Sequence, residues 1–370
     1  MLIIIKGNKI VIGLLLFCFG LLSTFVNITT AAVIAKTNNI ITVSKQNKNA
    51  DFDTITAALA SVPDNKEEYE IEIDSGIYEE QLIIERSAPV IFRGKINNNN
   101  HDEIISKTSS YKDNTVTLAW NQSTGDAYAG KSDEDTSVVV VKTNGFRAYN
   151  INFNQTFGLG FDGPQAVAVT VDADQTVFDQ CLFTSYQDTL FVGNTTWTGR
   201  QYYFKESYIA GAVDFIFGNS STYFDKCIIA SNGPGHISAQ KRQFHYEDMK
   251  IPSAMIFNEC QLITDWNTNG VDIKGKQDLG RPWRKYAKVI YMNPYIGDHI
   301  KPEGWGDWYS STLGDYSNVE YLEFNNSGPG SWEMNVEARE SVNYTRLIDY
   351  QKAKQYNLKE WYSSDLSWLV

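Results

Sequence analysis

Phe178-Asp179-Gln180-Cys181-Leu182-Phe183 is the stretch that decides the fold, because its pattern returns along the chain. The pattern is an aromatic residue, two polar residues, a small residue and an apolar pair. It recurs at residues 204–209, 224–229 and 257–262, with weaker echoes at 148–153 and 291–296. These segments start 30, 26, 20, 33 and 34 residues apart, which is the spacing of a solenoid.

Each repeat contains a strand-like segment such as Gln175-Thr176-Val177-Phe178, without helical periodicity. One coil cannot bury its apolar face alone, whereas stacked coils share a core. The sequence therefore predicts an all-β fold, a parallel β-helix in a single domain. A short helix at residues 53–60, with Asp53 as its N-cap, and a C-terminal tail with a helix near 350–361 are expected to pack on it. Residues 95–135 are polar and are predicted to form long surface loops around one short strand.

The small position of the repeat explains the cysteines. Cys181, Ser207, Cys227 and Cys260 would form a ladder facing the core. Cys181 and Cys227 would lie two coils apart, too far for a disulfide, whereas a bond between Cys227 and Cys260 is geometrically possible. Free buried thiols are the favoured interpretation, because cysteine packs well as a small apolar side chain. No cysteine spacing suggests a metal site.

The first residues are typical of a secretory signal. Lys6 and Lys9 precede an apolar run at residues 10–26, and small residues follow near Ala31 and Ala32. We expect residues 1–32 to be removed and residues 33–370 to form the secreted, extracellular domain; an uncleaved membrane anchor is the alternative. Secretion agrees with N-glycosylation triplets that begin at Asn121, Asn154, Asn194, Asn219, Asn325 and Asn343.

The charge excludes one class of partner. The net charge is -12, and loss of Lys6 and Lys9 with the leader leaves -14. Nucleic-acid binding needs a basic footprint, so we expect no nucleic-acid partner. The aromatic content of 13% is high and suggests a carbohydrate partner, although most of these rings must pack in the core.

Two acidic residues lie inside apolar, aromatic runs. Asp188 belongs to Thr184-Ser185-Tyr186-Gln187-Asp188-Thr189-Leu190-Phe191, and Asp214 follows 26 residues later in Asp214-Phe215-Ile216-Phe217-Gly218. Buried carboxylates are costly unless they are paired or used. If 26 residues make one coil, the two carboxylates stack on neighbouring strands, roughly 5 Å apart. Two adjacent carboxylates cannot both ionise easily, so their pKa values separate.

Four blocks of residues resemble the signature blocks of pectin methylesterases and occur in that family's order. They are Gly163-Pro164-Gln165-Ala166-Val167-Ala168, Tyr186-Gln187-Asp188-Thr189-Leu190, Asp214-Phe215-Ile216-Phe217-Gly218-Asn219 and Leu279-Gly280-Arg281-Pro282-Trp283. The resemblance extends from about Phe52 to Trp368 and Leu369. It implies a right-handed parallel β-helix that hydrolyses the C6 methyl esters of galacturonate units in pectin and releases methanol.

The resemblance also implies a role for each residue. By motif position, Asp214 is the nucleophile, and Asp188 is the general acid and then the base. Gln165 and Gln187 would donate to the oxyanion, and Arg281 would orient Asp214. This agrees with the chemistry, because an ester carbonyl needs a nucleophile, donors for the oxyanion and an acid for the departing methoxide.

Four aromatic residues occupy positions where the family lines its sugar groove: Phe191, Phe217, Trp283 and Trp305. Core packing is the alternative for each of them. The chain also departs from the family's pattern. Phe191 stands where many members carry Tyr, Ser207 replaces a Cys that is common in plant members, and residues 95–135 match poorly.

We therefore expect a monomeric pectin methylesterase with methyl-esterified pectin (homogalacturonan) as its partner. No cofactor, metal or stable membrane association is expected. A polygalacturonase would need acids spaced for glycoside cleavage, and a lyase would typically need a calcium site, so the paired glutamines fit neither. A β-helix that binds carbohydrate without catalysis is the other alternative. A serine esterase is disfavoured, because the chain has no G-x-S-x-G motif.

Overall fold

The computed structural model describes residues 2–5, 10–13, 39–97, 110–125, 130–157, 163–193, 199–244, 253–308, 315–362 and 366–369. It divides into two units, residues 1–40 and 41–370. In the first unit, β1 (Leu2–Ile5) pairs antiparallel with β2 (Ile10–Gly13). The rest of the expected leader, with its cleavage zone, lies outside the described residues.

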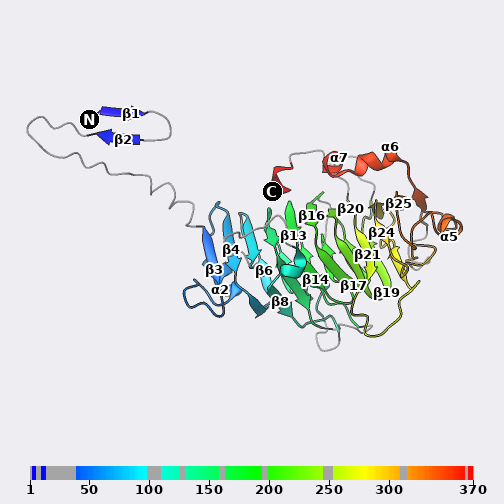
Figure 1. The fold of residues 1–370 in the computed structure, drawn as a ribbon, viewed down its shortest axis with the longest axis horizontal. Helices are drawn as coiled ribbons and strands as arrows, with labels where there is room; N and C mark the ends of the chain where they lie inside the picture. Colours follow the sequence, from blue (N-terminus) through cyan, green and yellow to red (C-terminus); the bar gives the residue numbers. More distant parts are fainter. Residues whose placement is uncertain are drawn as a thin grey trace, which may run out of the picture. The chain divides into compact units, whose positions relative to one another are not determined.

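The second unit is a parallel β-helix, as the repeat predicts. One sheet takes a strand from successive coils (Figure 1). In spatial order its strands are β3 (Ile40–Val43), β4 (Tyr69–Ile73), β7 (Val90–Gly94), β10 (Arg147–Tyr149), β13 (Thr176–Asp179), β16 (Gln201–Lys205), β18 (Ser221–Asp225), β20 (Ala254–Asn258), β23 (Lys288–Met292), β25 (Glu320–Phe324) and β26 (Thr345–Leu347). We call this the first sheet.

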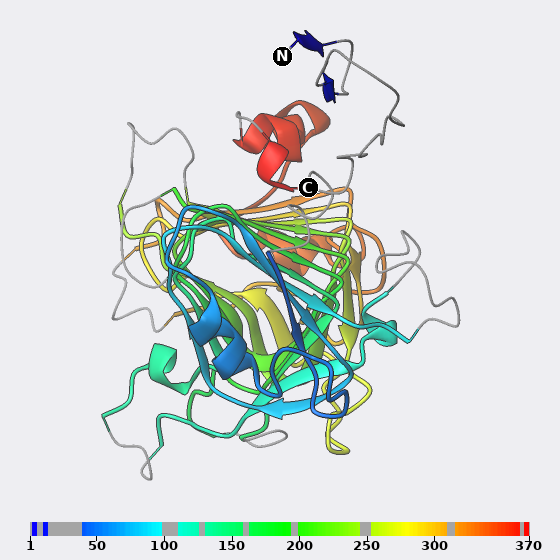
Figure 2. The same ribbon diagram turned by 90° about the vertical axis from the view of Figure 1, so that its left-hand side faces the viewer.

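The second sheet bends into two rows, which Figure 2 shows from the end of the coils. The upstream row contains β5 (Gly76–Glu79), β8 (Val116–Trp120), β11 (Ile151–Gln155), β14 (Leu182–Thr184), β21 (Gln261–Thr264) and β24 (Tyr295–Ile296). The downstream row contains β6 (Leu82–Ile84), β9 (Val139–Val141), β12 (Val169–Val171), β15 (Leu190–Val192) and β22 (Gln277–Gly280). The long strands β17 (Tyr208–Gly218) and β19 (Ile228–Gln240) run through both rows.

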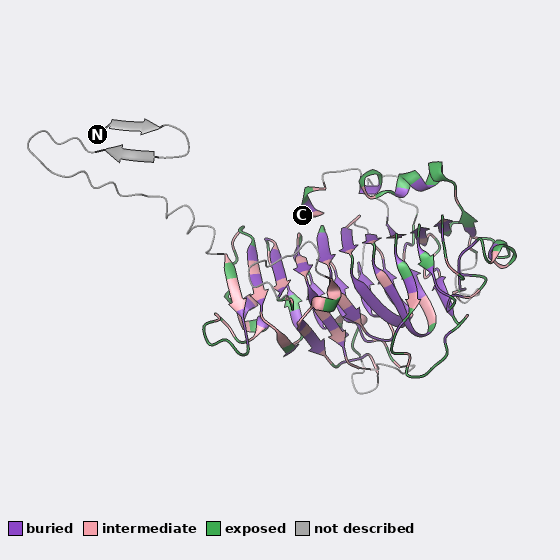
Figure 3. Ribbon diagram, viewed as in Figure 1, coloured by how far each residue is buried: buried purple, intermediate pink, exposed green. Residues whose placement is uncertain are grey.

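The register of the first sheet confirms the repeat. Phe178 pairs with Phe204, and the same register continues through Phe224 and Phe257 to Tyr291. Their rings stack along the core, with centroids 4.9, 5.0, 4.6 and 4.5 Å apart. Stacked rings bury large apolar surfaces in an offset geometry that aromatic pairs favour. Figure 3 shows the resulting burial along the strands.

The polar positions of the repeat make the turn out of the first sheet. Gln180, Glu206, Lys226 and Glu259 have φ of 54°, 47°, 55° and 52°, in the left-handed region that few residues other than glycine adopt. The residue that follows each of them turns into the core. The same backbone turn is thus repeated from coil to coil, and this explains why the repeat carries two polar residues before its small one.

The predicted ladder of small residues is confirmed. Cys181, Cys227 and Cys260 are buried and free, and no disulfide joins Cys227 to Cys260. Each thiol donates to a backbone carbonyl, as Cys181 Sγ does to Ala148 O at 3.5 Å. Burial raises the pKa of the Cys181 thiol well above its ordinary value. Ser207, at the equivalent position, accepts from the Cys181 N–H at 3.0 Å.

Short helices lie outside the coils. They are α2 (Ile55–Ser61), η1 (Tyr111–Asp113), α3 (Asp133–Thr136), α5 (Val336–Glu340), α6 (Tyr350–Ala353), η3 (Lys354–Tyr356), α7 (Leu358–Tyr362) and η4 (Ser367–Leu369). The cap of α2 differs from the expectation: Thr54, not Asp53, accepts from the Ala57 N–H. The C-terminal tail packs on the first sheet as expected, and Tyr362 donates to Tyr202 O at 2.7 Å.

The polar region at residues 95–135 contains the short strand that the sequence predicts, and also helical turns that it does not predict. β8 pairs in parallel with β5 and β11, so it is a full member of the upstream row. The Ser110 and Ser132 side chains cap η1 and α3 with reciprocal hydrogen bonds. Residues 98–109 and 126–129 of the predicted loops lie outside the described residues.

Candidate active site

The site is built where the chain bends from the upstream to the downstream row. Leu190 pairs with Ile216, and Gln187 forms a bridge with Val213. Both pairs are 26 residues apart, so Asp188 and Asp214 occupy the same register on neighbouring coils, as the spacing predicts. Both have left-handed backbones, with φ of 65° at Asp188 and 48° at Asp214. Such backbones in residues other than glycine are costly and are often found at functional sites.

Asp214 is held by Arg281, which follows the end of β22. Arg281 Nε donates to Asp214 Oδ1 at 2.9 Å, and Nη2 donates to Oδ2 at 2.6 Å. Both side chains are largely buried. The guanidinium carbon lies 4.2 Å from the centroid of the Trp308 ring, so one face of Arg281 is covered. A bidentate pair of this kind fixes the orientation of the carboxylate.

Asp188 has the opposite environment. It is 7% exposed, and burial raises the pKa of its carboxyl well above the ordinary value. The charges of Asp214 and Asp133 raise this pKa further, and Arg281 opposes them. The site thus combines a carboxylate paired with arginine and a carboxyl that favours its neutral form. Such a pair can supply a nucleophile and a proton donor at the same time.

Asp133 is a residue of this site that the sequence analysis missed. It lies in α3, and burial raises the pKa of its own carboxyl, against the effect of the Lys241 charge. In the sequence it stands in the acidic run Ser132-Asp133-Glu134-Asp135, which is typical of a surface loop. Nothing in that run separates Asp133 from its neighbours, and only the fold brings it near Asp188.

The two predicted glutamines lie on neighbouring coils beside the aspartates. The Ala166 N–H donates to Gln187 O at 3.2 Å, and this bond joins the Gln165 segment to the bend that carries Asp188. Gln165 Oε1 accepts from Thr124 Oγ1 at 2.7 Å. Because its oxygen is engaged in this way, the amide nitrogen of Gln165 is the end available to an oxyanion. Thr124 belongs to the region predicted to be loop, and its part in the site was not foreseen.

Aromatic rings cover one side of the site. Phe191 and Phe217 stack with their centroids 4.3 Å apart, and Trp283 lies 6.1 Å from Phe217. Trp308, which the sequence analysis did not single out, lies 6.0 Å from Trp283. Phe191 and Phe217 are almost buried, whereas Trp283 and Trp308 are partly exposed. The tryptophans therefore offer more ring surface to a sugar than the phenylalanines do.

Trp305 lies elsewhere. Its ring is 4% exposed and packs against Tyr291 and Tyr321 in the main core. Its Nε1 donates to the buried Glu323 Oε1 at 2.8 Å. This position fits the core-packing alternative rather than the predicted place in a sugar groove.

Cations line the aromatic side. Lys241 Nζ lies 4.5 Å from the Trp283 centroid, and the Arg284 guanidinium lies 5.3 Å from it on the same ring. Burial, followed by the Arg284 charge, lowers the pKa of the Lys241 ammonium. These groups supply local positive charge on an acidic chain. Over the residues that the structure describes, no cluster of three or more His, Cys, Asp or Glu side chains is arranged to hold a metal ion.

Comparisons with known proteins agree with this geometry. The pectinesterase family model matches residues 40–365. A protein of Aspergillus niger described as probable pectinesterase A is 38% identical over 291 residues, covering 79% of this chain and 79% of its own length. The crystal structure of a pectin methylesterase from the same species has a TM-score of 0.72 and 32% identity, and the match covers 89% of this chain and 97% of that one. Pectin methylesterase from carrot shares the fold, with a TM-score of 0.70 at 23% identity, over 87% of this chain and 92% of that one. The chain therefore belongs to the pectinesterase family.

Proposed function

We propose that this protein removes the C6 methyl esters of homogalacturonan and yields pectate and methanol. One observation carries the proposal: Arg281 holds the Asp214 carboxylate by both oxygens, in register with the buried Asp188. Membership of the family supplies the reaction class, and the geometry suggests the role of each residue.

Asp214 attacks the ester carbonyl carbon, and a tetrahedral oxyanion forms. The Gln165 and Gln187 amide N–H groups stabilise this oxyanion. As the intermediate collapses, the bond to the methoxy group breaks and Asp188 donates its proton, so that methanol leaves. The product is an anhydride between Asp214 and the uronate.

Water then hydrolyses the anhydride. Asp188, now ionised, accepts one proton from the attacking water, and the second tetrahedral intermediate collapses to release the Asp214 carboxylate and the galacturonic acid unit, which then ionises in solution. Asp188 ends the cycle protonated, as it began. Arg281 keeps Asp214 oriented throughout and stabilises its charge when it leaves.

Methanol release from highly methylated pectin tests the proposal, with new reducing ends and unsaturated products measured in the same reaction. Methanol without chain cleavage supports an esterase. Reducing ends or unsaturated products would instead indicate a glycosidase or a lyase. Pectin binding without any product would indicate a carbohydrate-binding protein and would reject the catalytic roles.

We further propose that the protein is secreted as a monomer after loss of residues 1–32. The signal-like N-terminus and the glycosylation triplets support secretion. Among the described residues, no helix is both long and apolar enough to cross a membrane. N-terminal sequencing and light scattering of the protein from culture medium test the proposal; a retained leader or a stable dimer would reject it.

Replacement of Gln165 by alanine is expected to lower kcat by about 10²- to 10³-fold, because one oxyanion donor is lost. The effect on KM should be small, since this donor acts mainly in the transition state. Steady-state methanol release checks both constants. A matched Thr124→Val variant keeps the amide but removes the bond that orients it, so its kcat should fall less. Equal kcat in the Gln165→Ala variant and the parent would remove Gln165 from the oxyanion site.

Replacement of Asp133 by asparagine is expected to shift the alkaline limit of activity to lower pH. The Asp133 charge helps to raise the pKa of Asp188, and the acid form of Asp188 is lost as the pH rises through that pKa. Without the Asp133 charge the pKa of Asp188 falls, so kcat declines earlier on the alkaline side. Profiles of kcat against pH test this, with Glu134→Gln in the same helix as the control. An unchanged profile, or a shift to higher pH, would contradict the coupling.

A further inference from the structure

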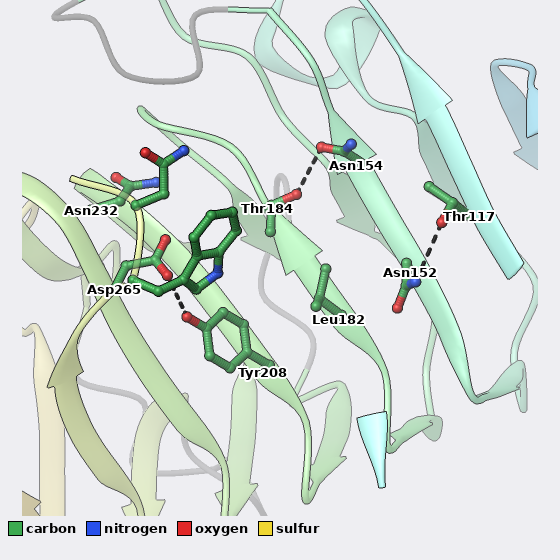
Figure 4. A pocket seen from close by; sticks show the side chains of 10 residues that line it. Thr117, Asn152, Asn154, Leu182, Thr184, Tyr208, Asn232 and Asp265 are labelled. Carbon is green, nitrogen blue, oxygen red and sulfur yellow. Dashed lines mark hydrogen bonds between the residues drawn. The ribbon is translucent and has the colours of Figure 1, made fainter. Parts of the chain in front are cut away.

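A separate pocket lies on the outer face of the upstream row, with a volume of about 330 Å³. Along β11 the side chains alternate: Ile151 and Phe153 are buried, and Asn152 and Asn154 face outward. Thr184 of β14 stands beside them in the next coil. Figure 4 shows these polar side chains on neighbouring strands of the pocket floor.

Apart from Leu182, the floor is polar, and its side chains are uncharged. Asn152 Nδ2 donates to Thr117 Oγ1 at 3.3 Å, and Thr184 Oγ1 donates to Asn154 Oδ1 at 2.8 Å (Figure 4). These amides and hydroxyls retain further donors and acceptors for a ligand. They form a surface that matches the hydroxyl groups of a sugar.

The far wall contains buried polar groups. Asp265 is 8% exposed and accepts from the Tyr208 hydroxyl at 2.6 Å. Asn232 is 6% exposed; its Nδ2 donates to Ser185 O at 2.8 Å, while its Oδ1 is buried without a partner among the described residues. An unpaired buried oxygen of this kind is costly.

Trp266 adds an apolar surface at the edge of this polar pocket. It is 88% exposed, the largest exposed fraction among the large apolar side chains of the described residues. Single exposed apolar residues are common on proteins. Here, however, the indole lines a cavity whose other walls are mostly amides, hydroxyls and a carboxylate, with Leu182 as a second apolar side chain. A sugar ring has an apolar face and polar hydroxyl groups at its edge. A flat aromatic ring beside hydrogen-bonding groups can contact both.

We propose that this pocket binds a methyl-esterified galacturonate unit of the polymer, away from the unit that reacts. The proposal rests on the pectin methylesterase function proposed above. Among the described residues that line the pocket, none is Lys or Arg, and Asp265 is a carboxyl. A uronate carboxylate would meet no positive charge there, so the pocket favours the ester over the acid.

The pocket lies close enough to the active site for one chain to occupy both. Thr184 precedes Asp188 by four residues, so their Cα atoms lie within about 14 Å of each other even if the chain is fully extended. Ser185 links the two sites: its carbonyl accepts from Asn232 of the pocket, and its hydroxyl donates to Ala166 O, next to Gln165, at 2.6 Å. Esterified units bound in the pocket would thus bring neighbouring units to Asp188 and Asp214.

The test compares Trp266→Ala and Trp266→Phe with Tyr350→Ala, a control that removes another exposed aromatic side chain far along the sequence. Calorimetry in an Asp214→Asn background measures binding of methyl-esterified and fully de-esterified oligogalacturonides. Trp266→Ala should raise the Kd for the esterified oligomer by about three- to tenfold, the effect of one lost ring contact. Trp266→Phe should recover part of the loss, and in the active enzyme the effect should fall on KM rather than on kcat.

Unchanged Kd and KM in Trp266→Ala would overturn the proposal, and equal weakening for esterified and de-esterified oligomers would overturn the preference for the ester. Asn154 also begins a glycosylation triplet, so mass spectrometry should find it unmodified; a glycan there would fill the pocket and reject the proposal for the secreted protein. If the parent releases no methanol but Trp266-dependent binding persists, the proposed function fails and the pocket stands. If the parent releases methanol but its binding does not depend on Trp266, the proposed function stands and the pocket proposal fails.

Discussion

Replacement of Asp214 by asparagine is expected to lower methanol release by roughly a thousandfold or more, because the amide cannot serve as the attacking carboxylate. Asparagine keeps the size of the side chain but removes the charge opposite Arg281. The loss should appear in kcat and in kcat/KM alike, since the nucleophile forms its bond only during the reaction. Methanol assays at saturating and at low pectin concentration separate the two constants.

A control must distinguish chemistry from folding. Asp179→Asn removes another largely buried aspartate, one paired with Lys205 at 3.0 Å at the end of β13, and it should keep most of the activity. The thermal unfolding of the Asp214→Asn variant should still show a single cooperative transition. A folded Asp214→Asn variant with activity near that of the parent would remove Asp214 from the role of nucleophile.

Replacement of Arg339 by leucine is expected to lower the free energy of unfolding by about 3–5 kcal/mol, because it leaves a buried charge unpaired. The Arg339 and Glu323 side chains are fully buried, and Nε lies 2.9 Å from Oε1. Arg339 also donates to Pro302 O at 2.6 Å and to Gly330 O at 2.7 Å. One guanidinium therefore holds three segments near the end of the β-helix together. Its loss leaves several buried acceptors without a donor.

Chemical denaturation of the parent and the variant measures this difference. An Arg339→Leu/Glu323→Gln double variant should recover part of the lost stability, since the unpaired charge is removed while the amide can still accept from Trp305. Arg346→Leu changes an exposed arginine in β26 and should cost little. An Arg339→Leu variant as stable as the parent would show that the pair contributes nothing to the fold.

The fold could be predicted because its information is local and repeated. The ring stack from Phe178 to Tyr291, the left-handed turn after each strand and the buried cysteines all follow from one six-residue pattern read at successive coils. The same argument placed Asp188 beside Asp214, since their spacing equals one coil. In a stack of parallel coils, residues that lie one coil apart in the sequence are neighbours in space. A repeat therefore determines both the core and the register of the strands.

The surroundings of Asp188 and Asp214 could not be predicted from the spacing of residues in the sequence. Asp133 and Thr124 reach the site from a polar region without a repeat, and Trp308 rather than Trp305 covers Arg281. The two tryptophans are three residues apart, and the path of an irregular segment decides which ring enters the core and which faces the site. The sequence by itself thus determined the β-helix, its core and the pairing of the two aspartates. Only the tertiary structure decided the depth of their burial, the pKa of Asp188, the Arg339 pair and the pocket beside Trp266, because these depend on side chains that non-repeating segments bring together from distant parts of the chain.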